Sequence, residues 1–129
     1  MVISNFIKAE CLLFNVVEDN FNEALNEWIE HCKNPRVRFS SFDEEVRDCN
    51  ACRKIVSLGP KVLPLIRKLY DRDSSGNFEL SIIQGHGLVE IVGQIVGSDF
   101  QIPEAIRGRI SKMGNYTKNW LDENMSRYG

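Results

Sequence analysis

Apolar residues recur at spacings of three and four along most of the chain, which is the period of an amphipathic helix. Over 4–17 this pattern predicts a helix whose apolar face is Phe6, Ala9, Leu12, Leu13 and Val16. The run 11–17 is also short and apolar enough for a strand, so both readings stay open. A separate helix is predicted from Asn20-x-x-Glu23, a capping-box pattern, to the Asn34-Pro35 pair. Its inward face is Phe21, Leu25, Trp28, Ile29 and Cys32.

A further helix is predicted to open at Ser41-x-x-Glu44 and to end at Gly59. Its apolar face is Phe42, Val46, Cys49, Arg53 and Val56, with Cys52, Ile55 and Gly59 beside it. Gly59 suits the left-handed conformation that closes many helices. The missing amide of Pro64 would forfeit a helical bond to Pro60, so we expect a loose turn over 59–62 and a regular helix from Leu63. Three residues of that helix region, Lys61, Arg67 and Lys68, are predicted to face solvent.

The stretch 78–97 is apolar on nearly every side, which predicts a buried, central helix with a possible irregularity at 85–87. Its β-branched residues and glycines favour strands instead, and this alternative stays open. After a connection, Pro103 fits the first position of a last helix of about five turns. Gly114 is a weak point in that helix, costing roughly 1 kcal/mol relative to alanine.

These elements predict one domain over 1–129, all-α, with five or six helices in antiparallel pairs or a compact orthogonal bundle. The chain is 43% hydrophobic and 26% charged, with a net charge of −2. The lack of a positive excess does not favour a nucleic-acid binder. No apolar run is predicted to span a membrane. The first residues lack a signal-peptide pattern, so we expect a cytoplasmic protein whose four cysteines are free thiols.

Two stretches resemble an uncharacterised family of short helical proteins. The first is Ile55-Val56-Ser57-Leu58-Gly59 with Leu63-Pro64-Leu65-Ile66, and the second is Ile102-Pro103, Arg107-Gly108, Met113 and Trp120-Leu121. The resemblance covers about the C-terminal two thirds of the chain. It implies an all-α, HEAT-like arrangement and lends no activity, because none is established for the family. The chain departs from the family in its glycine-bearing stretch 78–97, which replaces a tryptophan-rich helix, and in a longer spacing from Met113 to Trp120.

Cys49 and Cys52 form a C-x-x-C motif, and His31 and Cys32 precede it. Four such ligands could bind zinc, although a single C-x-x-C is a weak signal. Cysteine buried as a small hydrophobic residue is the simpler interpretation. A thioredoxin-like redox role would require the motif at the N-terminus of a helix that follows a strand, whereas the predicted helix places it in the middle.

Two other segments carry candidate chemistry. Asp71, Asp73, Ser75 and Gly76 match the first half of a calcium loop, but Ile82 stands where a bidentate glutamate should complete it. An ordinary turn between helices is rich in the same residue types as this half of a calcium loop, so we expect weak calcium binding or none. His86 lies between two glycines in the most apolar stretch, and Glu90 is its candidate partner in a catalytic role. A histidine satisfied by the backbone, or placed at a bend, is the simpler interpretation.

Arg107, Arg109 and Lys112 form a basic side on the last predicted helix and are candidates for contacting a partner. The overall expectation is a non-catalytic interaction module without a cofactor, which binds another protein or another copy of itself. The alternative is a zinc-binding regulatory protein or a redox protein that uses Cys49 and Cys52. An enzyme with His86 at its site is the third hypothesis, and it requires a pocket with a polar partner beside that histidine.

Overall fold

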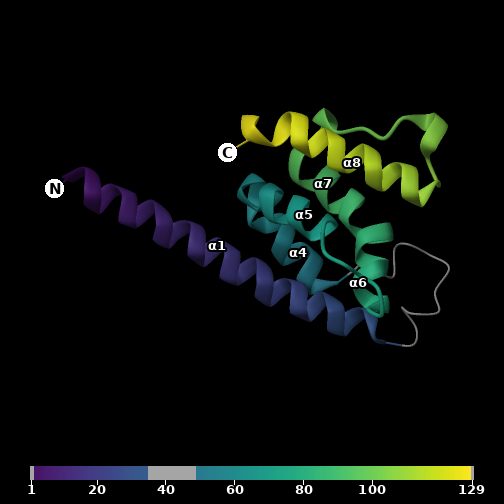
Figure 1. Cartoon of the computed structure of the whole chain (residues 1–129), viewed down its shortest axis with the longest axis horizontal. Coiled ribbons are helices and arrows are strands. Elements are labelled where there is room, and N and C mark those ends of the chain that lie inside the picture. The colour runs from purple at the N-terminus through teal and green to yellow at the C-terminus, as the bar shows by residue number, and fades with distance from the viewer. Residues whose placement is uncertain (1, 35–48, 129) are drawn as a thin grey trace.

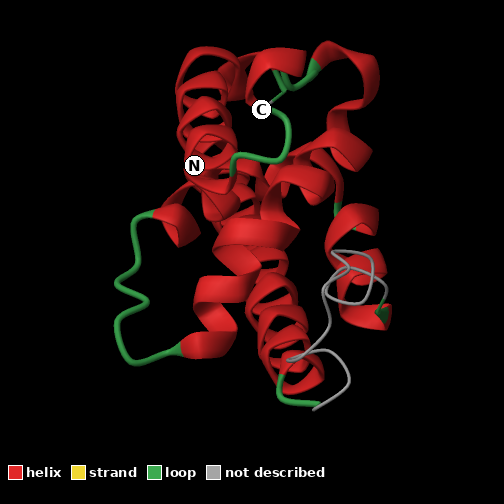
Figure 2. Ribbon diagram, turned by 90° about the vertical axis from the view of Figure 1, so that its right-hand side faces the viewer, coloured by secondary structure: helices red, strands yellow, loops and turns green. Residues whose placement is uncertain are grey.

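The computed structural model describes residues 2–34 and 49–128, and it describes residues 2–14 through their backbone alone. Within these ranges the chain forms five helices and no strand, which confirms the all-α prediction (Figure 2). The helices are α1 (Val2–Cys32), α4 (Asn50–Ser57), α5 (Leu63–Tyr70), the continuous α6–η2–α7, and α8 (Ile110–Asn124). The segments of the continuous helix are α6 (Phe78–Ile82), η2 (Ile83–Gly87) and α7 (Leu88–Val96). The finer HEAT-like arrangement stays a prediction.

Helix α1 is a single helix of 31 residues, so the helix interpretation of 4–17 is correct and its strand alternative is wrong. The predicted start of a new helix at Asn20 is also wrong, because the helix passes through this residue without interruption. Residues 2–32 include neither glycine nor proline, and nothing in the sequence breaks the helix there. The helix ends at Cys32, just before the Asn34-Pro35 pair, as predicted.

Helices α4 and α5 meet at the predicted corner. Gly59 has a φ of 79°, which confirms that it is the left-handed residue after α4. The loose turn is the 3₁₀ helix η1 (Gly59–Val62), and α5 follows from Leu63 as expected. The start of α4 differs from the prediction, since Cys49 is extended, with φ −149° and ψ 158°, and caps a helix that begins at Asn50. The predicted start at Ser41 lies outside the described residues.

The apolar stretch 78–96 is one helix with an irregular centre, as predicted. Its middle turn, η2, is a π-helix that includes Gly85, His86 and Gly87. By length and composition, 78–99 would be apolar enough to cross a membrane, so the prediction that no run reaches this length is wrong. The same helix buries Ile83, Leu88 and Ile91 in the core, and 33% of its apolar 18-residue window is buried.

The last helix begins later than predicted. Pro103 is extended, with a ψ of 138°, and leads into only the 3₁₀ turn η4 (Glu104–Ile106). Gly108 then takes a φ of 82°, which no regular helix permits, and α8 starts at Ile110. Two further 3₁₀ turns, η3 (Gly97–Asp99) and η5 (Met125–Arg127), follow α7 and α8.

The C-terminal half of α1 lies along α4, and α8 packs on α5 and on the end of the π-helix (Figure 1). The hydrophobic core lies between these helices. Its residues below 2% exposure include Trp28, Ile55, Leu63, Ile66, Leu80, Ile83, Leu88, Ile91 and Leu121. Two ion pairs on the surface connect neighbouring helices. Lys54 Nζ of α4 lies 2.7 Å from Glu27 Oε1 of α1, and Arg67 Nε of α5 lies 2.8 Å from Asp122 Oδ1 of α8. Arg67 also pairs with Asp71, so it is not the purely solvated residue that we predicted.

Candidate functional site

The first candidate is the face of α1 that the body of the protein leaves uncovered. Figure 1 shows the N-terminal half of this helix extending past the other helices into solvent. The C-terminal half is covered, because Phe21, Leu25 and Trp28 are at most 4% exposed. Val16 belongs to the apolar face predicted for 4–17, and its side chain is 55% exposed. It is the most exposed large hydrophobic residue among those whose side chains are described.

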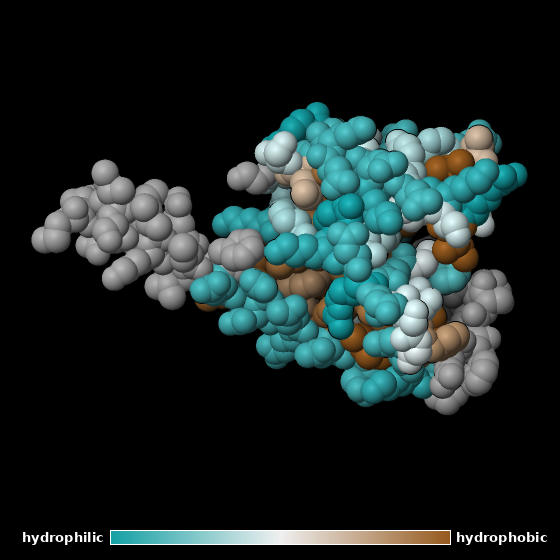
Figure 3. All heavy atoms as spheres, viewed as in Figure 1, coloured by the Kyte–Doolittle hydropathy of each residue, from teal (hydrophilic) through white to brown (hydrophobic). Residues whose placement is uncertain are grey.

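The rotation of the helix explains why Val16 is uncovered. Five residues separate it from Phe21, and at about 100° per residue they lie about 140° apart around the axis. A body that covers Phe21 therefore cannot also cover Val16. Val17, one residue on, packs against the core and marks the edge of the covered side. The surface of the body seen in Figure 3 is mainly hydrophilic, with its apolar areas small and separate.

The second candidate is the Cys49–Cys52 pair at the N-terminus of α4. The two Sγ atoms lie 2.7 Å apart, and the Cys52 amide donates to Cys49 Sγ over 3.3 Å. Cys49 is 7% exposed and Cys52 is 3% exposed, which confirms the predicted burial. The prediction that the motif lies in the middle of a helix is wrong, because Cys49 is the N-cap. The helical start is the position at which a thiolate is stabilised.

The electrostatics distinguish the two thiols. The hydrogen bond from the Cys52 thiol lowers the pKa of Cys49 to about 6, and the backbone amides of Cys52 and Ala51 act in the same direction against desolvation. The same hydrogen bond and burial raise the pKa of Cys52 above its ordinary range. Burial also raises the pKa of Cys32 to about 12. The hydrogen bond therefore favours negative charge on Cys49 and keeps the proton on Cys52, while burial favours the neutral form of Cys32.

The zinc hypothesis required His31 and Cys32 to join this pair. Cys32 is buried at the end of α1, and His31 beside it is half-buried. Within 15–34 and 49–128 no three histidine, cysteine or acidic side chains come together in a way that could hold a metal ion. The positive charge of a protonated His31 would contribute to lowering the pKa of Cys49. The zinc hypothesis for these residues stays a prediction.

The residues of the calcium-like loop have other partners. Asp71 Oδ1 lies 2.9 Å from Arg67 Nη1, and Asp73 Oδ1 accepts the Ser75 amide over 2.9 Å. Asn77 caps α6 by accepting the Leu80 amide over 3.1 Å. The first is an ion pair between residues four apart, and the other two are turn and cap interactions of the kind that short polar side chains form between helices. Weak calcium binding or none stays a prediction for this loop.

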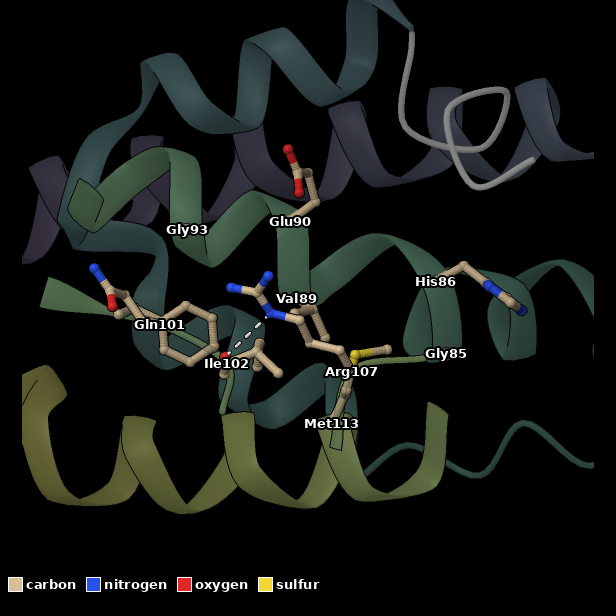
Figure 4. A pocket seen from close by; sticks show the side chains of 10 residues that line it. Gly85, His86, Val89, Glu90, Gly93, Gln101, Ile102, Arg107 and Met113 are labelled. Carbon is tan, nitrogen blue, oxygen red and sulfur yellow. Dashed lines mark hydrogen bonds between the residues drawn. The ribbon is translucent and has the colours of Figure 1, made fainter. Parts of the chain in front are cut away.

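His86 lines a pocket of about 510 Å³ together with Glu90 and Arg107 (Figure 4). This is the kind of pocket that the enzyme hypothesis required. Figure 4 shows that the three polar side chains diverge, with the His86 ring pointing away from the other two. Arg107 Nε donates to the Ile102 carbonyl over 3.4 Å, and Glu90 accepts from Gln94 over 3.4 Å. The hypothesis of an enzyme with His86 at its site stays a prediction.

The basic candidates Arg107, Arg109 and Lys112 are all exposed. They do not share one face of a helix as predicted, because only Lys112 is within α8. Arg107 and Arg109 flank Gly108 in the turn that precedes the helix. The cluster is a basic turn at a helix start, and its role in contacting a partner stays a prediction.

In comparisons with known proteins, no family model, curated protein or solved structure matches the chain. The resemblance to short HEAT-like proteins therefore stays a prediction. The sequence analysis missed two features of the candidate sites, the continuity of α1 and the helix start at Cys49. The absence of glycine and proline from 2–32 was the available signal for the first.

Proposed function

We propose that this protein is a non-catalytic interaction module that binds another polypeptide through one face of α1. This Val16 face carries Val16 and the apolar residues at 6, 9, 12 and 13. The partner is either a different protein or a second copy of this chain. The observation that carries the proposal is that α1 continues beyond the body with its apolar side uncovered at Val16. The proposal also places the protein in the cytoplasm and assigns it neither a cofactor nor a nucleic-acid ligand.

Two physical arguments support this function. A long helix that leaves its domain loses the tertiary packing on which most helical stability depends. The sequence places apolar residues at 6, 9, 12, 13 and 16 in one helical register, which is the pattern of a helix that docks against another helix. Covering such a side chain is favourable, because fully burying one valine contributes about 1.5–3 kcal/mol. A partner helix along this face would supply the missing contacts.

The test uses the full chain and two matched variants. Val16→Glu places a charge on the apolar face, whereas Asn15→Glu places the same charge on the neighbouring residue, which is also exposed. Sedimentation velocity over a range of concentrations reports self-association. Affinity capture from the native host, with a differently tagged second copy present, reports binding to either kind of partner.

We expect a complex that Val16→Glu weakens by at least about tenfold, equivalent to 1.4 kcal/mol. Asn15→Glu should leave the complex largely unchanged, and circular dichroism should show both variants folded. Two results together would show that the proposal is wrong. The wild-type chain stays monomeric in sedimentation, and the wild type and Val16→Glu capture the same polypeptides from the host. The identity of the captured chain decides between self-association and a different partner.

A further inference from the structure

We propose that Cys49 and Cys52 form a reversible disulfide on reaction with a peroxide, with Cys49 as the reacting nucleophile. This activity is independent of the binding face on α1 and goes beyond the proposed function. It makes the start of α4 a thiol-redox site. The site consists of two cysteines that the fold holds against each other.

The two sulfur atoms are close enough for a disulfide bond to form between Cys49 and Cys52. Their Sγ atoms lie 2.7 Å apart, and a disulfide requires about 2.05 Å, so a small rotation of either side chain would bring them to bonding distance. The Cys52 amide already points at Cys49 Sγ, which fixes the orientation of the two residues. Cysteines whose backbones hold the sulfurs this close need no rearrangement of the fold to pair.

The two sulfurs differ in the way that a nucleophile and a resolving thiol must differ. Cys49 is the N-cap of α4, where the unpaired amides of the first turn stabilise negative charge. The hydrogen bond from Cys52 lowers the pKa of Cys49, whereas the pKa values of Cys52 and Cys32 are raised, so Cys49 is the sulfur on which negative charge is favoured. Cys49 is also the more exposed of the pair, at 7% against 3%.

Burial selects the class of oxidant. A protein disulfide could not reach sulfurs that are more than nine-tenths covered, whereas a peroxide is close to water in size. The Cys49 thiolate attacks one peroxide oxygen, the O–O bond breaks, and Cys49 becomes a sulfenic acid while hydroxide leaves. The Cys52 thiol then attacks the Cys49 sulfur, the S–O bond breaks, and water leaves with the thiol proton. One thiolate and one thiol are oxidised, and one peroxide is reduced to one hydroxide and one water.

Reduction returns the pair to its starting state through a small-molecule dithiol, because the same burial that excludes a protein disulfide also excludes a protein dithiol. One thiolate of the reductant attacks Cys49 Sγ, which releases the Cys52 thiolate and forms a mixed disulfide. The second thiolate of the reductant resolves that bond and releases Cys49. In a cytoplasm that keeps thiols reduced, Cys49 and Cys52 would stay in the dithiol form when no peroxide is present.

The chain offers a direct readout, because trypsin cleavage after Arg47 and Arg53 leaves both cysteines in one peptide, 48–53. The full-length protein is treated with hydrogen peroxide, the remaining thiols are alkylated under denaturing conditions, and the digest is analysed by mass spectrometry. We expect this peptide to escape alkylation and to be lighter by about 2 Da, the mass of two hydrogens. Dithiothreitol given before alkylation should restore two alkylated cysteines. The peptide that includes Cys32 should stay alkylatable at peroxide concentrations at least about tenfold higher.

Two variants assign the roles. Cys52→Ser removes the resolving thiol, so Cys49 should accumulate as a sulfenic acid that dimedone traps. Cys32→Ala is the control, and it should leave the 49–52 disulfide unchanged. The proposal is overturned if wild-type peptide 48–53 stays fully alkylatable while Cys32 is oxidised, or if dimedone labels Cys52 in Cys49→Ser as readily as it labels Cys49 in Cys52→Ser. If a variant fails to fold, the alkylation of peptide 48–53 in the wild-type protein still tests whether the disulfide forms.

Discussion

Gly87 and Trp28 approach so closely that no side chain fits at residue 87. A Cβ built on this glycine would lie 2.3 Å from Cζ2 and 2.6 Å from Cη2 of the indole. Trp28 is fully buried in α1, so its ring has no free space into which it could move. The π-turn of the central helix therefore depends on a glycine to bring it against α1.

Gly87→Ala should destabilise the fold by about 1–3 kcal/mol, because the added methyl overlaps the Trp28 ring and forces a shift in a packed core. Gly93→Ala in the same helix is the control, since its Cβ would meet only Phe100 at 3.9 Å. That change should be neutral or stabilise by up to about 1 kcal/mol. Urea unfolding followed by circular dichroism measures both. Equal stability of the two variants would show that the Gly87–Trp28 contact is not tight.

A second pair of identical substitutions tests the helix boundaries. Gly59→Ala places a side chain at a φ of 79°, which should cost about 1–2 kcal/mol although, among the described residues other than its chain neighbours, none has an atom within 4 Å of the new Cβ. Gly114→Ala falls within α8, where the new methyl meets Tyr70 at an ordinary 3.9 Å, and it should stabilise by up to about 1 kcal/mol. Denaturant midpoints should move in opposite directions. A more stable Gly59→Ala would place the corner elsewhere.

The sequence predicted the corner at Gly59 and the irregular helix 78–96 because each depends on local chemistry. Glycine after a helix and two prolines four residues apart restrict the backbone directly. The helix start at Cys49 could not be read in this way, since the apolar spacing of Cys49 and Val56 continues across the boundary. The exposure of Val16 depends on where the other helices end, which is a tertiary property. Asn20 matched a capping box, yet α1 passes through it, because the residues on either side include neither glycine nor proline to break the helix.

The Tyr70 hydroxyl offers a test of buried polarity. It is covered from solvent and has no hydrogen-bond partner among the described residues, while the nearby Thr117 hydroxyl donates to the Met113 carbonyl instead. Burial raises the pKa of Tyr70 above its ordinary range. Tyr70→Phe removes the unpaired hydroxyl and keeps the ring, so we expect stability to rise by about 1 kcal/mol. A loss of stability in thermal unfolding would reveal a hydrogen bond at this position.

The charge state of Cys49 can be titrated directly. With a pKa of about 6, against an ordinary value of 9.0, the thiolate should form as the pH rises through 6 in the folded protein. The ultraviolet absorbance of the thiolate measures this step without requiring access to the buried sulfur. Cys49→Ser should abolish the step, whereas Cys32→Ala should retain it. A first thiolate step near pH 9 would contradict the assignment of Cys49 as the nucleophile.

The most direct measurement of the central claim places a photoreactive amino acid at position 16 of the full chain and irradiates living cells of the native host. The same amino acid at Asn26, an exposed residue on the covered half of α1, is the control. We predict a crosslinked product larger than the monomer from position 16 and little from position 26, with mass spectrometry identifying the second polypeptide. Equal yields from the two positions, or no product from position 16, would contradict the assignment of this face as the binding surface.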